Sequence, residues 1–255
     1  MDILQYLIAA IGAFAAGAVN ALAGGGTLIT FPLLTALGLP AVTANITSTV
    51  SLFPGYFGAT YAQRTDLKGQ GKQLKWLLPA AAVGGLFGGL LLAYSGEKTF
   101  RQIVPFLILF ASLLLALGEP LKKWVSARNR NQEQSAKSPI IAVVAIAAAA
   151  VYGGYFGAGL SVIVLAFLGL LFDDSLTRLN ALKQAIALAT NTAAATYFLF
   201  SGKVIWSLAF VMAASALLGG IAGGKLAGRV SPTLLRWLVV SIGLIVSVIF
   251  FIQIY

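Results

Sequence analysis

The sequence contains no cysteine and no histidine, and it has few charged residues. Without these two residue types, disulfides, thiolate chemistry, imidazole catalysis and most zinc or copper sites are excluded. We therefore expect no cofactor and no metal ion. Charged residues make up 9% of the 255 residues, whereas soluble domains have about 25%.

Acidic residues are also scarce, and none lies in the middle of an apolar run. The seven are Asp2, Asp66, Glu97, Glu119, Glu133, Asp173 and Asp174. Proton relays in transporters run through intramembrane carboxylates or histidines. Such a relay has no obvious carrier here, and an enzyme would lack its usual acid, base or metal ligands.

Long apolar runs dominate what is present. Hydrophobic residues make up 59% of the chain and the mean hydropathy is +0.93. Residues 3–23, 74–94 and 234–255 each approach the roughly 20 residues that cross a hydrocarbon core as a helix. Residues 42–62, 182–200 and 206–226 are interrupted only by small or uncharged polar residues, proline, Lys183 and Lys225. The first run has no basic start, so it belongs to the fold and not to a signal peptide. The sequence predicts an all-α polytopic membrane protein.

The chain also repeats itself with a shift of about 135 residues. The shift aligns the glycine pairs of residues 84–89 with those of residues 219–224, Asn45 with Asn180, and Arg101 with Arg236. We divide the chain into a first membrane repeat (1–120), a cytoplasmic linker (121–138) and a second membrane repeat (139–255). The polar linker is expected to be flexible.

Each repeat contains a helix, a glycine-rich break, a short apolar piece (27–37 or 160–172) and three full spans. The short pieces cannot cross a bilayer alone, so each repeat is predicted to contain a broken or re-entrant helix pair plus three transmembrane helices. Three net crossings per repeat force the second repeat to insert upside down. The fold is therefore predicted to consist of two inverted-topology repeats.

Basic residues crowd one side of this predicted topology. Lys and Arg are enriched in cytoplasmic loops, and all but three of the placed ones fall on the linker's side. The three exceptions are Lys98, Arg101 and Lys203. We therefore expect a multi-pass protein of the inner (cytoplasmic) membrane with both termini outside. The net charge of +10 follows from this topology and does not indicate nucleic-acid binding.

The two glycine-rich breaks are the candidate substrate site. Glycines let the backbone unwind, and the start of a new helix offers unpaired N–H groups to an anion. The candidate residues in the breaks are Asn20, Gly24, Gly25, Gly26, Thr27, Gly157, Ala158, Gly159 and Ser161. Close helix packing without a ligand is the alternative explanation.

Polar residues within the spans add further candidates, namely Asn45, Thr47, Lys183 and Asn191. Intramembrane polar groups usually face the bundle interior, although threonine often bonds back to its own helix. Lys183 either extends to the lipid headgroups or attracts an anion toward the breaks, and both readings stay open.

The ordered set of short motifs resembles one known family. The motifs are residues 17–26, 31–34, 38–40 and 44–48, with second-half echoes at 153–159, 191–198 and 202–206. Together they are similar to the TauE/SafE sulfite-exporter family over nearly the whole chain. The resemblance implies export of sulfite or related organosulfur anions such as sulfonates and thiosulfate. The chain differs from the family pattern at residues 157–161, where the glycine run is shorter, and at Lys183.

We therefore expect a transporter that exports a small anion by alternating access between the two breaks. An inside-negative potential contributes roughly 2.3 kcal/mol per charge per 100 mV to such export. A passive anion channel and a permease for a different organic anion are the alternatives, and a membrane enzyme or scaffold is a third class. The expected partners are the anionic substrate and the lipid bilayer, and a homo-oligomer is left open.

Overall fold

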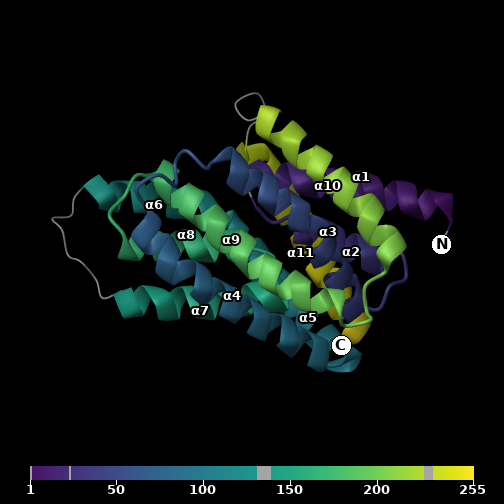
Figure 1. Cartoon of the computed structure of the whole chain (residues 1–255). Coiled ribbons are helices and arrows are strands. Elements are labelled where there is room, and N and C mark those ends of the chain that lie inside the picture. Colours follow the sequence, from purple (N-terminus) through teal and green to yellow (C-terminus); the bar gives the residue numbers. More distant parts are fainter. Residues whose placement is uncertain (1, 23, 131–138, 227–231) are drawn as a thin grey trace.

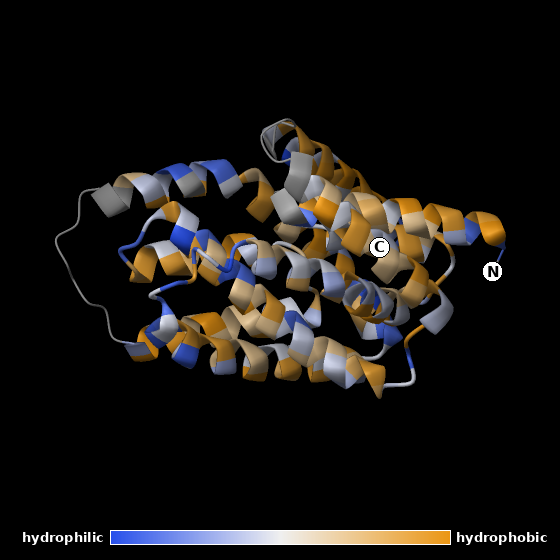
Figure 2. Cartoon of the chain, turned by 45° about the horizontal axis from the view of Figure 1, so that its top comes forward, coloured by the Kyte–Doolittle hydropathy of each residue, from blue (hydrophilic) through white to orange (hydrophobic). Residues whose placement is uncertain are grey.

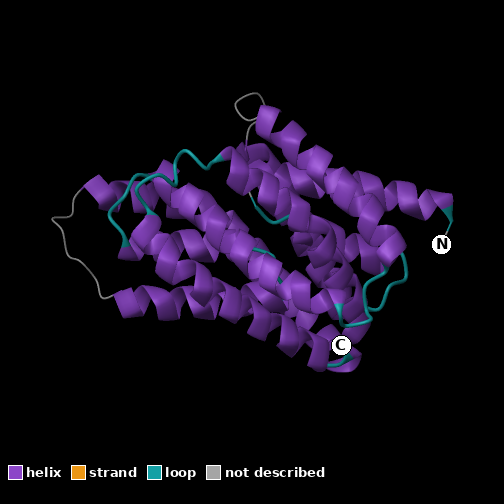
Figure 3. Cartoon of the chain, in the orientation of Figure 1, coloured by secondary structure: helices purple, strands orange, loops and turns teal. Residues whose placement is uncertain are grey.

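The structure, a computed structural model, describes residues 2–22, 24–130, 139–226 and 232–255. In these ranges the chain forms eleven helices and no strands (Figure 3). The first half contains α1 (Ile3–Leu22), α2 (Thr27–Ala36), α3 (Ala41–Ala62), α4 (Gly71–Tyr94) and α5 (Glu97–Ala116). The second contains α7 (Pro139–Tyr155), α8 (Leu160–Leu171), α9 (Leu176–Leu199), α10 (Trp206–Leu226) and α11 (Pro232–Ile254), and α6 (Gly118–Arg130) connects the halves.

Five of the described helices, α1, α4, α5, α10 and α11, are long and apolar enough to cross a membrane. Many large apolar side chains on these helices are exposed, and Figure 2 shows that hydrophobic residues are frequent along the helices. Lipid is the solvent that accepts such a surface. The chain is a multi-pass membrane protein, as the sequence predicts.

The short pieces and the longer polar spans also form where expected. Helices α2 and α8 have 10 and 12 residues, and each follows a glycine-rich break. Helices α3 and α9 are 22 and 24 residues long and contain buried polar side chains. Because those side chains lie inside the bundle, α3 and α9 form its core and meet each other there.

Glycine pairs set the closest helix contacts. A methyl group on Gly84 or Gly88 of α4 would overlap backbone carbonyls of α7, and one on Gly85 would overlap α9. In the second half, a methyl group on Gly219 of α10 would overlap the backbone of α1. Small residues allow membrane helices to approach this closely, so each glycine motif seats its helix against helices of the other half.

The contacts between helices follow the sequence repeat. Helix α1 packs against α10 as α7 packs against α4, and α3 packs against α10 as α9 packs against α4. Contacts along α4 and α7 advance in the same direction, from Gly84 beside Ala147 to Gly88 beside Val151. These two helices are therefore parallel.

The long axis of the helix bundle has two ends, which different parts of the chain occupy (Figure 1). The start of α1 and the end of α11 lie at one end, which we call the terminus end. The end of α6 and the start of α7 lie at the opposite end, which we call the linker end.

The expectation of a flexible linker is wrong for its first part. Residues up to Arg130 form helix α6, which packs against α8 and α9. Val125 is completely buried in that contact. Burying an apolar side chain stabilises a helix that is otherwise polar and amphipathic. Residues 131–138 lie outside the described residues.

Candidate functional site

Each of the two breaks contains two glycines with positive φ angles. Gly24 and Gly25 have φ angles of 79° and 94°, and Gly157 and Gly159 have φ angles of 84° and 76°. Side chains other than glycine rarely adopt these values because Cβ clashes with the backbone. Two glycines in each break therefore let the chain reverse and start a new helix at Thr27 and at Leu160.

The two breaks lie against each other. A methyl carbon on Gly24 would lie 3.2 Å from Cβ of Ser161, and one on Gly157 would lie 3.7 Å from Oγ1 of Thr27. Each contact joins a glycine of one break to the first turn of the short helix after the other break. The structure thus brings together the nine candidate residues that the sequence assigned to the breaks.

Several backbone N–H groups at this contact are unsatisfied. Within the described part of the chain, the amides of Gly25, Thr27, Ala158, Gly159 and Ser161 have no hydrogen-bond acceptor. All but Ser161 belong to buried residues. Buried N–H groups without a partner are rare in proteins because each costs a hydrogen bond. Five of them in one place can therefore donate hydrogen bonds to oxygen atoms of a solute or of water.

Three side chains hold the breaks in this conformation. The amide N–H of Gly26 donates to Oδ1 of Asn20 (2.8 Å). The hydroxyl of Tyr152 donates to the carbonyl oxygen of Ala158 (2.7 Å), and Nδ2 of Asn45 donates to the carbonyl oxygen of Tyr155 (2.9 Å). Asn20 and Asn45 therefore support the backbone of the breaks.

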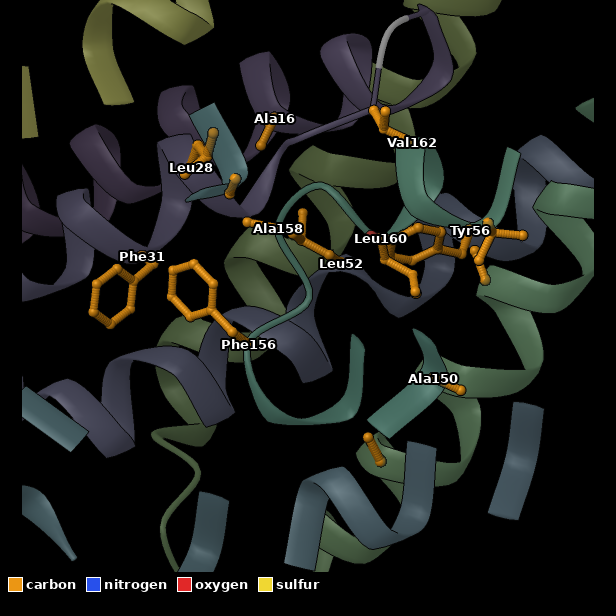
Figure 4. Packing of buried hydrophobic residues seen from close by; sticks show 14 of the residues in the cluster. Ala16, Leu28, Phe31, Leu52, Tyr56, Ala150, Phe156, Ala158, Leu160 and Val162 are labelled. Atoms are coloured by element: carbon orange, nitrogen blue, oxygen red, sulfur yellow. The ribbon is translucent and has the colours of Figure 1, made fainter. Parts of the chain in front are cut away.

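Tyr56 of α3 connects the first break to α9. Its hydroxyl interacts with the side-chain amides of Asn20 and Asn191, and Figure 4 shows its ring beside Leu160. Nδ2 of Asn191 also donates to the carbonyl oxygen of Ala187 in its own helix (2.9 Å). Asn191 thus reaches the site region through Tyr56.

Sequence reasoning missed Tyr56 and Tyr152. The available signal was a phenolic hydroxyl inside an apolar span, because a buried tyrosine hydroxyl usually finds a partner.

Two predicted candidates make hydrogen bonds with residues outside the breaks. Oγ1 of Thr47 accepts the amide N–H of Ile205 (3.2 Å), which ties α3 to the start of α10. Nζ of Lys183 donates to Oδ1 of Asn180 (2.9 Å). Thr190 of α9 lies at the level of the second break, beside Gly153. Lys183 precedes it by about two helical turns, or roughly 10 Å along the axis.

Aromatic rings cover the breaks on the terminus side. The ring of Phe31 lies 5.5 Å from that of Phe156 in an edge-to-face arrangement (Figure 4). Phe31 also contacts Phe100 and Phe250 at centroid distances of 6.1 Å. Such pairs are stabilising in their own right, and here they form an apolar layer that excludes water.

The comparison with protein families decides the class of the protein. The model of the family "Sulfite exporter TauE/SafE" matches residues 9–250, which include both breaks and all thirteen candidate residues. The chain belongs to the TauE/SafE family. This confirms the resemblance found in the sequence.

Curated relatives of this TauE/SafE protein are named as transporters. "Probable membrane transporter protein YfcA" of Escherichia coli is 29% identical over 237 residues, covering 92% of this chain and 85% of the relative. A "Probable membrane transporter protein" of Haemophilus influenzae is 26% identical over 227 residues, covering 89% and 87%. No solved structure matches the chain.

As a member of the TauE/SafE family, the chain is a membrane transporter and not an enzyme. Its described residues include no group of three or more histidine, cysteine or acidic side chains that could hold a metal ion. What the site offers is backbone amides and uncharged polar side chains, and these are groups that bind a solute without reacting with it.

Proposed function

We propose that this transporter exports a small anion, sulfite or a related organosulfur anion such as a sulfonate or thiosulfate. The anion binds between the two breaks and is exposed to each side of the membrane in turn. The observation that carries the proposal is the set of five amide N–H groups without acceptors where the breaks meet. The family description, sulfite exporter, supports the substrate class.

Amides in this position favour an anion over a neutral or cationic solute. The first turns of α2 and α8 begin at the breaks, and helix N-termini carry a partial positive charge. A dehydrated site strengthens each of these interactions because the local dielectric constant is low. Thr27 and Ser161 add hydroxyl groups at the same helix starts.

Alternating access requires that the halves exchange roles, and the helix contacts support inverted repeats. Helix α4 runs parallel to α7 and also to α9, since Gly85 faces Thr190 and Gly89 faces Ala194. If successive spans α3 and α4 cross in opposite directions, then α9 is antiparallel to its counterpart α3. The same reasoning gives opposite directions for residues 1–120 and 139–255.

The charge distribution supports an orientation with both termini outside. Arg64 and Lys68 lie between α3 and α4, Lys72 lies in the first turn of α4, and Arg178 lies in the first turn of α9. These segments are at the linker end (Figure 1). Basic residues favour the cytoplasmic side, so the linker end faces the cytoplasm of an inner membrane.

A charge substitution beside the amides tests the site directly. Asn20→Asp keeps the oxygen that accepts the N–H of Gly26 and adds a negative charge next to the break. A unit charge about 6 Å from an anion costs about 3 kcal/mol at an effective dielectric constant of about 20. We expect anion flux to fall by more than about tenfold.

The measurement is flux in proteoliposomes with sulfite, thiosulfate, a sulfonate and a carboxylate. Asn180→Asp is the matched control, because it makes the same change beside Lys183 at the linker end. We expect this control, and Lys183→Ala, to change flux less than Asn20→Asp does. Equal losses for the two Asp variants would refute the site between the breaks.

The same liposomes separate the remaining alternatives. Saturable flux that speeds up with anion on the opposite side indicates a carrier, whereas unitary conductance steps indicate a passive channel. Preference for the carboxylate over all three sulfur anions would indicate a permease for a different organic anion.

A further inference from the structure

A cavity opens at the terminus end of the molecule. Its volume is about 570 Å³, and it lies between the end of α2, the start of α5 and the end of α11. Arg101 lines it together with Thr35, Phe250 and Gln253. Phe250 contacts Phe31 of the aromatic layer, so the floor of the cavity is the layer that covers the breaks.

The repeat relation identifies the counterpart of this cavity at the linker end. A shift of 135 residues maps Thr35 to Leu170, Arg101 to Arg236 and Gln253 to Gly118. A methyl carbon on Gly118 would lie 3.8 Å from Cδ of Arg236, so these two residues are in contact. Arg236 is only 6% exposed, whereas its counterpart Arg101 is exposed. The linker-end counterpart is therefore occupied by protein.

Helix α6 provides the groups that occupy it. NH1 of Arg236 lies 2.9 Å from Oε1 of Glu119 at the start of α6. Further along α6, the completely buried Val125 packs against Gly169 of α8. The contact is so close that a methyl group on Gly169 would overlap the side chain of Val125. Among the described residues, Arg101 lines an open cavity, whereas Arg236 is covered by the start of α6. The two ends therefore differ in this contact.

We propose that α6 is a gate that closes the linker end, and that the ion pair between Glu119 and Arg236 holds it shut. In this structure the terminus end is open only as far as the aromatic layer, and the linker end is closed by α6. This inference rests on the proposed exchange of access between the two halves. To open the linker end, α6 leaves α8, Glu119 separates from Arg236, and Val125 becomes exposed.

The absence of cysteine makes the gate directly measurable by single-cysteine labelling. Val125→Cys reports the contact beneath α6, and Thr35→Cys reports the terminus-end cavity. Each variant is placed in lipid nanodiscs, where both faces are accessible, and is labelled with a membrane-impermeant maleimide. The labelling rate is compared with and without Glu119→Gln.

We expect Glu119→Gln to speed labelling of the cysteine at 125 by about tenfold, which corresponds to about 1.4 kcal/mol. Removing the carboxylate beside the buried Arg236 is unfavourable for the closed state, because the guanidinium loses its partner. Labelling at position 35 should slow as the opposite end opens. Asp174→Asn is the matched control, because it breaks another ion pair at the linker end, with Arg178 (2.8 Å), that does not involve α6.

A second variant moves α6 without touching a charge. Gly169→Ala places a methyl group where Val125 sits, and it should also speed labelling at position 125. Unchanged rates at position 125 in both Glu119→Gln and Gly169→Ala would overturn the gate. Equal acceleration by Asp174→Asn would overturn it as well, because the effect would then be general loosening.

Labelling requires no transported anion, so the gate and the proposed function fail separately. A shift in labelling with no flux of any anion would retain the gate and refute the function. Normal flux that is blocked by Asn20→Asp, with no shift in labelling, would retain the function and refute the gate.

Discussion

Gly88 of α4 is the position where adding one methyl group should have the clearest cost. The carbon would overlap the carbonyl oxygen of Val151 and lie 2.8 Å from the amide nitrogen of Tyr155. Both atoms belong to the backbone of α7, so no side-chain rotation relieves the overlap. Gly88→Ala must push α4 and α7 apart.

Two opposing effects set the change in the free energy of unfolding of Gly88→Ala. Alanine in a helix interior is favoured over glycine by about 1 kcal/mol. Overpacking a tight interface costs about 1–3 kcal/mol, and the lost contact between the halves adds to it. The free energy of unfolding of Gly88→Ala should therefore fall by about 1 kcal/mol or more.

The chain supplies two graded controls. A methyl carbon on Gly58 of α3 would have its nearest neighbour, Cδ1 of Leu217, at 3.9 Å. Gly58→Ala should therefore keep most of the propensity gain. Gly89→Ala should lie between the two, because its methyl carbon would be 3.3 Å from Cα of Ala194.

Thermal unfolding in detergent, followed by the fluorescence of the four tryptophans, measures this series. The expected order of midpoints is Gly58→Ala, then Gly89→Ala, then Gly88→Ala. A midpoint for Gly88→Ala at or above that of Gly58→Ala would refute the claim that backbone contact between α4 and α7 requires glycine.

Two further predictions concern hydrogen bonds. Both carboxylate oxygens of Glu97 accept hydrogen bonds from N–H groups at the start of α3, those of Ala41 and of Val42 (3.0 Å for the latter). Glu97→Gln should therefore lower the free energy of unfolding by about 1 kcal/mol. Unchanged denaturation by urea in micelles would contradict this. Tyr152→Phe removes the hydroxyl that donates to the carbonyl oxygen of Ala158, so it should lower the free energy of unfolding by about 1 kcal/mol. It should also slow anion flux, because the second break becomes looser. Flux equal to that of the unmodified protein would rule out a supporting role for Tyr152.

Much of the helical framework could be predicted from sequence because the membrane imposes it. A helix from Ile3, short helices after both breaks, and spans ending at Ala62 and Tyr94 all follow from apolar length and glycine position. These features depend on local composition and on the thickness of the hydrocarbon core. The same physics predicts that the breaks carry amide N–H groups without partners inside the helix.

The rest depends on contacts between distant residues. Helix α6 is polar enough to read as a linker, and only the pocket beside Gly169 makes burial of Val125 favourable. Likewise, Tyr56 reaches Asn20 and Asn191 because α3 crosses α9. Neither sequence spacing nor composition reports such a crossing. For Lys183, the charge suggested an attraction for the anion, and the structure shows that Nζ donates a hydrogen bond to Oδ1 of Asn180.

In the proposed function, the position of Lys183 about two turns before Thr190 on α9 suits export driven by the membrane potential. A lysine in direct contact would hold a dehydrated anion through a full charge, at about 4 kcal/mol for a separation of about 4 Å and an effective dielectric constant of about 20. Amides carry only partial charges, so they compensate the anion for its lost hydration and still release it. A conducting site must bind weakly enough to let its substrate leave. In the proposed orientation, Lys183 lies about two turns toward the linker end, so its attraction would assist entry from the cytoplasm without opposing release on the far side.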